Sequence, residues 1–186
     1  MSNQFVKKNK ALFLDRDGVI NKDYGYVYQI NKFDLIDNIK ILIKAAKAKG
    51  YKIIVVTNQA GIGRGFFSED DFENLTNYMK DLFLKDKCAI DAVYYCPYHS
   101  TEGVGKYLKN SNDRKPNPGM LIKAKKKFNL DMNKSILIGD KFSDIEAGIK
   151  SSVKTNILFK NNNIKNINKS YEFIEINCLT EALKYL

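Results

Sequence analysis

The 186-residue sequence contains no tryptophan, one histidine and three cysteines, and it has no long hydrophobic run. Three scattered cysteines cannot build a disulfide framework, so we expect a reducing, cytoplasmic setting. No window approaches the roughly 18 consecutive apolar residues of a membrane span. The polar, basic N-terminus does not resemble a secretory signal. The sequence therefore predicts no membrane association.

Acidic residues are outnumbered, 21 against 31 basic ones, and the net charge is +10. A basic surface can bind nucleic acid. The lysines here are spread along the chain instead of clustering among aromatic residues, so we expect no nucleic-acid partner. The length favours a single domain over residues 1–186. No large apolar stripe remains beyond the predicted core faces, which favours a monomer.

Short apolar runs alternate with amphipathic stretches, which predicts an α/β fold. Continuous apolar runs of this length are typical of strands buried on both faces of a parallel sheet. The predicted strands are Ala11–Leu14, Ile53–Val56, Val93–Tyr95, Ile136–Ile138 and Thr155–Phe159, with an edge strand at Tyr171–Ile176. We expect a doubly wound, Rossmann-like, mostly parallel sheet with ligands at the carboxyl ends of its strands.

Helical patterns lie between these strands. Apolar residues from Ile39 to Ala46 share one face before Gly50, and Ser68 with Asp71 is a capping signal. The helix after Ser68 is expected to bury Phe72, Leu75, Met79 and Leu82. Further helices are expected after Pro118, over Phe142–Lys150 and over Leu179–Leu186. Residues 161–170 are expected to form a surface loop. The glycines at 61, 63 and 65 indicate either a simple turn or a flexible loop that approaches an anion.

Asp15 and Asp17 stand two residues apart, directly after the first apolar run and before Gly18. Residues i and i+2 of a strand point the same way. Two like charges placed together need compensation, commonly by a divalent cation. The alternative is a surface loop with two solvated acids. Thr57 and Asp140 follow two further apolar runs, so the predicted sheet brings them to the same edge.

Four motifs together resemble those of the haloacid dehalogenase superfamily of phosphatases. They are Asp15-x-Asp17, Thr57-Asn58, Lys115 and Gly139-Asp140-x-x-x-Asp144. Their order and spacing match over residues 11–144. The resemblance implies a Rossmann-like domain without a large cap domain, and a phosphatase that uses Mg²⁺.

The roles of the acidic residues follow from this resemblance. Asp15, Asp140 and the main-chain carbonyl of Asp17 would hold Mg²⁺, which screens the repulsion between a phosphate dianion and an anionic nucleophile. Asp15 would attack phosphorus and form an aspartyl-phosphate. Asp17 would protonate the leaving alkoxide and then accept a proton from the hydrolytic water.

The remaining motif residues are implied to bind the phosphoryl group. Thr57 and Asn58 would hold its oxygens, and Lys115 would neutralise its charge. Asp144 either acts at the site, by tuning the cation or fixing Lys115, or is a solvated helix residue. Lys141 is either a substrate contact or a solvated residue at a helix start.

The intervening segments are similar to the family of D-glycero-D-manno-heptose 1,7-bisphosphate phosphatases. The similar segments are Asp23–Val27, Thr57–Gly65, Tyr94–Pro97 and Arg114–Met120. The resemblance implies removal of the C7 phosphate from a sugar bisphosphate, giving heptose 1-phosphate for lipopolysaccharide or surface polysaccharide. The second phosphate needs further cations, for which Arg114, Lys141 and Arg64 are candidates. The predicted substrate contacts are Asp23, Tyr24, Gly25, Tyr26, Asn58, Gln59, Ala60, Arg64, Arg114 and Lys141.

One segment departs from this family, which usually holds a structural zinc with Cys-x-His and Cys-x-Cys. Cys96 is present, but the other three ligand positions are Tyr98, Ser111 and Asp113, and His99 stands one place late. A closed zinc site needs four ligands, so we expect no zinc. The loop from residue 100 to 113 must then be held by packing or be mobile.

Three alternatives remain. Histidinol-phosphate phosphatases share the Asp-Arg-Asp-Gly, Thr-Asn-Gln and Arg-Lys-Pro motifs. A nucleic-acid 3′-phosphatase would use the same motifs, but no aromatic stacking platform is evident. A non-enzymatic sugar-phosphate-binding module would be expected to have lost Asp15 or Asp17, and both are present. The single His99 has no recognisable Ser or Cys partner for nucleophilic catalysis.

Overall fold

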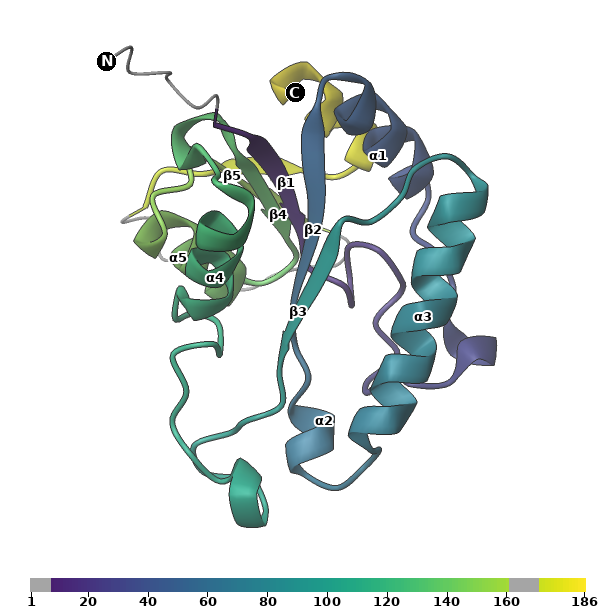
Figure 1. The fold of residues 1–186 in the computed structure, drawn as a ribbon, viewed down its shortest axis with the longest axis vertical. Helices are drawn as coiled ribbons and strands as arrows, with labels where there is room; N and C mark the ends of the chain where they lie inside the picture. The colour runs from purple at the N-terminus through teal and green to yellow at the C-terminus, as the bar shows by residue number, and fades with distance from the viewer. Residues whose placement is uncertain (1–7, 161–170) are drawn as a thin grey trace, which may run out of the picture.

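The structure is a computed structural model that describes residues 8–160 and 171–186 (Figure 1). The described residues form one sheet of six parallel strands in the order β3-β2-β1-β4-β5-β6. The strands are β1 (Lys10–Leu14), β2 (Tyr51–Asn58), β3 (Ala92–Cys96), β4 (Ile136–Gly139), β5 (Thr155–Phe159) and β6 (Ile174–Ile176). This is the strand order of the Rossmann fold, so the predicted fold class is confirmed. The loop predicted at 161–170 lies outside the described residues.

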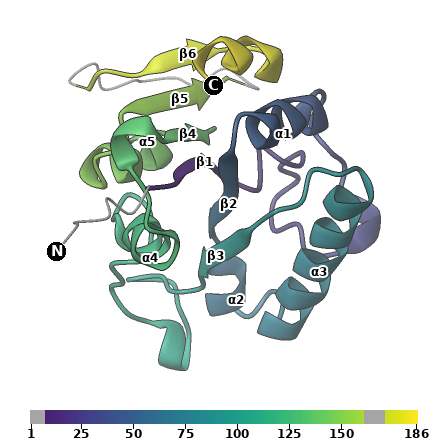
Figure 2. The ribbon, with the colours of Figure 1, turned by 45° about the horizontal axis from the view of Figure 1, so that its top comes forward.

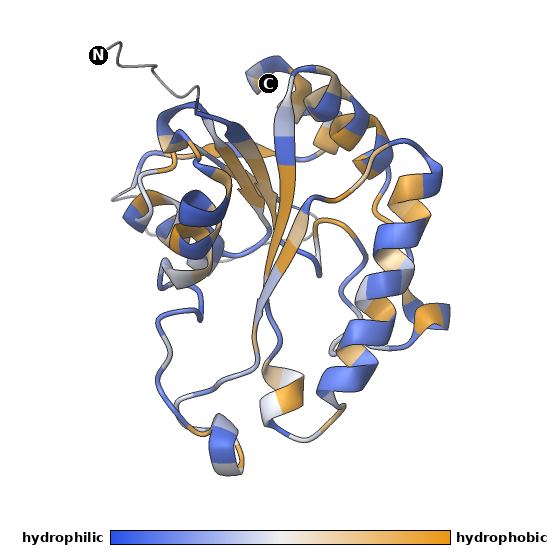
Figure 3. Cartoon of the chain, viewed as in Figure 1, coloured by the Kyte–Doolittle hydropathy of each residue, from blue (hydrophilic) through white to orange (hydrophobic). Residues whose placement is uncertain are grey.

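Helices cover both faces of the sheet (Figures 1 and 2). One face is covered by α1 (Ile39–Ala48), α3 (Glu69–Lys85) and the 3₁₀ helix η4 (Leu179–Tyr185), and the other by α4 (Gly119–Phe128) and α5 (Phe142–Lys150). Successive residues of β1 alternate between the layers. Leu12 and Leu14 pack towards α1 and α3, whereas Ala11 and Phe13 pack towards α4 and α5. Burial on both faces explains the continuous apolar run, and Figure 3 shows the apolar colour concentrated in the sheet.

The predicted helix signals are confirmed. The Ser68 hydroxyl accepts a hydrogen bond from Asp71 N at 3.0 Å, and the Asp71 carboxylate accepts one from Ser68 N at 2.8 Å. In α3, however, the residue fully buried near the C-terminal end is Phe83 instead of Leu82. Phe83 lies eleven residues after Phe72, close to three full turns, so the two side chains line up on the same face.

Three expectations differ in detail. β3 is an edge strand of the sheet, as β6 is at the opposite edge, so the β3 residues from Ala92 to Tyr95 are only half-buried. The final helix is of the 3₁₀ type and ends at Tyr185. The glycine-rich segment forms a short helix, α2 (Ala60–Gly63), instead of a flexible loop. A Cβ on Gly61 would lie 2.2 Å from the Phe67 ring and 2.7 Å from the Tyr26 ring, so close packing requires this glycine.

The two long connections leave the carboxyl ends of β1 and β3 and form the walls of the site described below. Residues 15–38 contain only the 3₁₀ turn η1 (Ile30–Lys32), and residues 97–118 contain only η2 (Gly105–Tyr107). Neither connection holds an inserted domain, as predicted. Over residues 8–160 and 171–186, no helix has the length and apolar character needed to cross a membrane.

Candidate active site

The carboxyl ends of the neighbouring strands β1 and β4 form the floor of the site. Asp15 follows β1 and Asp140 follows β4, and Asp15 N donates a hydrogen bond to Ile138 O at 3.0 Å. After β1 the chain crosses one face of the sheet, and it reaches β4 from the opposite face. The gap between these two strands is therefore the topological switch point, where Rossmann folds bind ligands. Carboxylate oxygens of Asp15, Asp140 and Asp144 lie within 4.8 Å of one another. The predicted convergence of Asp15 and Asp140 is confirmed.

Gly18 makes this convergence possible. It has φ +90°, and a Cβ built on it would lie 2.2 Å from Asp140 Oδ2. Only a residue without a side chain allows the β1 connection to turn so closely over the carboxylate.

Lys115 balances two of the three carboxylates. Its side chain is 1% exposed, and its Nζ lies 3.0 Å from Asp15 Oδ1 and 2.5 Å from Asp144 Oδ1. It also donates a hydrogen bond to Val56 O at 2.8 Å. Burial opposes its charge, but Asp144 and Asp15 raise the pKa of Lys115. Asp144 is buried, so the reading of it as a solvated helix residue is wrong.

The site still carries an excess of buried negative charge. Burial, with repulsion from Asp144 and Asp17, raises the pKa of Asp15 to about 6 despite the attraction of Lys115. Burial and repulsion from Asp15 raise the pKa of Asp140 to about 8. Asp140 Oδ1 is buried and has no hydrogen-bond partner. Carboxylate oxygens in this arrangement are the donors that a hard divalent cation prefers.

The last residues of β2 and the residue after it hold other parts of the site. Asn58 pairs with the backbone of Lys115: its Nδ2 donates to Lys115 O and its Oδ1 accepts from Lys115 N, both at 3.0 Å. Gln59 Nε2 donates to Thr57 Oγ1 at 2.8 Å and to Asp17 Oδ2 at 2.9 Å. Both amides are engaged within the protein. Their side chains therefore fix Lys115 and Asp17.

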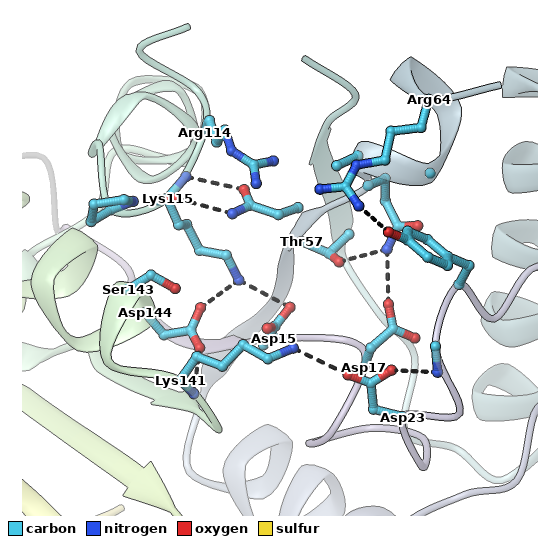
Figure 4. Close-up of a pocket in the computed structure, with 17 residues that line it drawn as sticks. Asp15, Asp17, Asp23, Thr57, Arg64, Arg114, Lys115, Lys141, Ser143 and Asp144 are labelled. Carbon is cyan, nitrogen blue, oxygen red and sulfur yellow. Dashed lines mark hydrogen bonds and ion pairs between the residues drawn. The ribbon is translucent and has the colours of Figure 1, made fainter. Parts of the chain in front are cut away.

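These residues open into a cavity of about 600 Å³ (Figure 4). Nearly all the predicted site residues line it; they are Asp15, Asp17, Asp23, Gly25, Tyr26, Thr57, Asn58, Gln59, Ala60, Arg64, Arg114, Lys115 and Lys141. Asp140 is not among the lining residues, but its carboxylate belongs to the cluster with Asp15 and Asp144. Tyr24 does not line this cavity. Its hydroxyl donates to Asp34 at 2.7 Å and its ring borders a neighbouring hollow.

Two groups of cations face the cavity. Lys141 lies 3.1 Å from Asp23 and 3.8 Å from Asp140; burial opposes its charge, but these carboxylates raise its pKa. Arg64 and Arg114 lie on the other side of the cavity (Figure 4). Burial and repulsion from Arg64 lower the pKa of Arg114. Arg64 donates a hydrogen bond to the Tyr26 hydroxyl and forms an ion pair with the exposed carboxylate of Glu102.

The loop that departs from the zinc-binding pattern is held by hydrogen bonds and by packing of Tyr107 against Ile62, Phe67 and Phe72. Tyr107 donates a hydrogen bond from its hydroxyl to Glu69 of α3, and Val104 N donates to Gly63 O at 2.8 Å. Over the part of the chain that the structure describes, metal-ligating side chains gather in threes only at the carboxylate cluster, and not beside Cys96. The expectation that zinc is absent stays a prediction.

Sequence reasoning missed three residues at the site. Arg16 is 1% exposed and contacts Asp17, and Asn21 donates to Asp17 Oδ1 at 3.0 Å. Ser143 lines the cavity at the start of α5. Of these three, only Arg16 had a signal in the sequence: it stands between Asp15 and Asp17, where its guanidinium group can reach a carboxylate.

Comparison with known proteins identifies the family. A family profile described as "Polynucleotide kinase 3 phosphatase" matches residues 10–173. The chain is 56% identical over 151 residues to the D-glycero-alpha-D-manno-heptose-1,7-bisphosphate 7-phosphatase of Burkholderia mallei, covering 81% of this chain and 80% of that protein. It is 47% identical over 152 residues to the D-glycero-beta-D-manno-heptose-1,7-bisphosphate 7-phosphatase of Haemophilus influenzae, covering 82% of each.

A solved structure has the same fold. It is the D,D-heptose 1,7-bisphosphate phosphatase from B. bronchiseptica complexed with magnesium and phosphate, with a TM-score of 0.78, 20% identity and coverage of 94% of this chain and 96% of that one. The chain belongs to the haloacid dehalogenase-type phosphatase family that includes these heptose bisphosphate phosphatases, and it is a phosphoric monoester hydrolase.

Proposed function

We propose that this chain hydrolyses the C7 phosphate of D-glycero-D-manno-heptose 1,7-bisphosphate and releases heptose 1-phosphate. The observation that carries the proposal is one cavity with two separate cationic groups. Lys115 and Lys141 lie beside the carboxylate cluster, and the side chains of Arg64 and Arg114 lie above it in the view of Figure 4. A sugar with a phosphate at each end needs such a pair of anion sites. The names of the relatives support the same substrate.

The carboxylate cluster fits Mg²⁺ as the cofactor. Asp15, Asp140 and the main-chain carbonyl of Asp17 would hold it, and the unpartnered Asp140 Oδ1 is an available ligand. The cation would supply positive charge that offsets repulsion between the phosphate and the carboxylates. Asp144 would fix Lys115 from below through their 2.5 Å ion pair.

The protein's own residues would perform two successive displacements. An Asp15 oxygen attacks phosphorus, the bond from phosphorus to the C7 oxygen breaks, and Asp17 gives its proton to that oxygen. Water then attacks the phosphorus of the aspartyl-phosphate, Asp17 accepts the water's proton, and the Asp15 carboxylate is restored. Thr57 and Lys115 would hold the phosphoryl oxygens through both steps, because both side chains line the cavity beside Asp15.

Phosphate release from a panel of substrates tests the proposal. The panel contains both anomers of heptose 1,7-bisphosphate, fructose 1,6-bisphosphate, histidinol phosphate and a 3′-phosphorylated oligonucleotide. We expect the heptose bisphosphates to give the highest kcat/KM, and Asp15→Asn to abolish turnover. A preference for histidinol phosphate would overturn the substrate assignment, and turnover by Asp15→Asn would overturn the covalent mechanism.

Arg64→Met separates the two phosphate sites. It should raise KM for heptose 1,7-bisphosphate and leave KM for heptose 7-phosphate unchanged, because the second substrate has no distal phosphate. An equal rise in KM for both substrates would show that Arg64 does not bind the distal phosphate.

The product would supply nucleotide-activated heptose for lipopolysaccharide or surface polysaccharide.

A further inference from the structure

The carboxylate of Asp17 accepts hydrogen bonds from three side chains to which the proposed mechanism gives no role. Arg16 Nε donates to Oδ1 at 3.2 Å, and Arg16 Nη2 donates to Oδ1 at 3.0 Å and to Oδ2 at 2.9 Å. Gln59 Nε2 donates to Oδ2 at 2.9 Å, and Asn21 Nδ2 donates to Oδ1 at 3.0 Å. Donors therefore approach both oxygens, and 17% of the side chain remains exposed. We call Arg16, Asn21 and Gln59 the Asp17 clamp.

The Asp17 clamp is itself fixed by buried contacts. The Arg16 side chain is 1% exposed, and its Nη2 also donates to Val27 O at 2.6 Å and to Gln59 Oε1 at 3.3 Å. Its guanidinium group lies 5.6 Å from the centre of the Phe72 ring of α3. Arg16 and Gln59 thus bind each other as well as Asp17. Neither can reorient without losing several hydrogen bonds, and both side chains are buried.

Strand geometry alone does not set the orientation of the Asp17 side chain. β1 ends at Leu14, so the alternation that would align Asp17 with Asp15 has already stopped. Gln59 supplies the missing constraint, because the same Nε2 donates to Asp17 and to Thr57 Oγ1. This bridge (Figure 4) ties the proton-transferring carboxylate to the end of β2, which holds the phosphoryl group.

We propose that Arg16 and Gln59 are positioning residues that orient Asp17 towards the oxygen leaving the phosphorus. The inference rests on the proposed function, in which Asp17 is the general acid. Misplacing a catalytic group by about 1 Å costs about 100-fold in rate, and positioned general acids contribute about 10²–10⁴-fold. Lysine cannot replace Arg16 here, because only arginine presents donors on two nitrogens, Nε and Nη2, in one rigid plane to the carboxylate.

The dependence of kcat/KM on the leaving group tests the proposal in Gln59→Met and Arg16→Lys. A sugar alkoxide needs a proton as it leaves, whereas p-nitrophenolate leaves without one. The ratio kcat/KM covers only the steps up to phosphoryl transfer to Asp15. We expect both variants to lose about 100-fold in kcat/KM with heptose 1,7-bisphosphate and roughly threefold or less with p-nitrophenyl phosphate, since general-acid help is not needed there.

Ser135→Ala is the matched control for loss of a buried polar contact. Ser135 Oγ accepts a hydrogen bond from Ala11 N at 3.0 Å, so it supports β1 at the end away from the site. This variant should be less stable but keep the wild-type ratio of the two activities. Equal losses on both substrates in folded Gln59→Met, or in Arg16→Lys should Gln59→Met not fold, would overturn the inference. Wild-type protein that hydrolyses neither substrate would instead overturn the proposed function.

Discussion

Asp144→Asn tests how the buried charges of the site are balanced. The substitution keeps the shape of the side chain and removes one negative charge 2.5 Å from Lys115 Nζ. The side chains are 2% and 1% exposed, so water cannot replace the lost partner. The Asp144 carboxylate also accepts a hydrogen bond from Lys141 N at 3.0 Å. An asparagine has one acceptor oxygen and cannot serve both donors as the carboxylate does.

The expected loss in the free energy of unfolding is about 2 kcal/mol. Removing one partner of a buried ion pair commonly costs about 3–5 kcal/mol. Two features of the site reduce this value. Lys115 keeps Asp15 at 3.0 Å and Val56 O at 2.8 Å, so its charge is not left alone. Loss of the Asp144 charge also relieves repulsion on Asp15 and Asp140.

Urea unfolding in the presence of EDTA measures this loss, and phosphate release measures the second consequence. Lys115 then loses one of its three partners and is held less firmly in position, so kcat should fall by about 100-fold. Asp86→Asn is the matched control, because Asp86 pairs with Lys40 on the surface and its loss should not change the unfolding midpoint. An Asp144→Asn protein with wild-type stability and wild-type kcat would refute this account of the site.

Three further predictions follow from the same geometry. Gly18→Ala should reduce phosphate release more than tenfold (about 1.4 kcal/mol per factor of ten) and weaken the response to Mg²⁺, because a Cβ there meets Asp140 at 2.2 Å; an unchanged Mg²⁺ titration would contradict this. The native pKa values of Asp15 and Asp140, about 6 and about 8, lie above the ordinary 3.8, so the metal-free native protein binds more protons than the unfolded chain and loses stability as the pH rises from about 4 to 8. Thermal unfolding should therefore show a larger rise in Tm with Mg²⁺ at pH 8 than at pH 5.5, and a rise that shrinks with pH would oppose this reasoning. Tyr107→Phe removes the hydrogen bond to Glu69 and should speed proteolysis of the loop from 97 to 113 while kcat stays constant; equal cleavage rates would show that the bond does not hold the loop.

Much of the site was predictable because its signals are local. Asp15, Asp17 and Gly18 follow a buried apolar run, and Asp140 follows another, so the parallel arrangement of the strands was enough to bring the acids to one edge. The capping pair at the start of α3 was equally visible, since it depends on residues three apart. The 3₁₀ form of the last helix was not, because it depends on how the chain ends against the sheet.

The sequence by itself determined the strand and helix pattern and the phosphatase motifs, because these depend on residue type and short spacing. Only the tertiary structure decided that the side-chain amides of Asn58 and Gln59 form hydrogen bonds with Lys115 and Asp17. It also decided that Tyr24 lines a neighbouring hollow and not the cavity of the site. A polar side chain can use the same hydrogen-bonding groups to bind a substrate or another part of the protein. Which partner it takes depends on the groups that long-range packing places within about 3 Å of it.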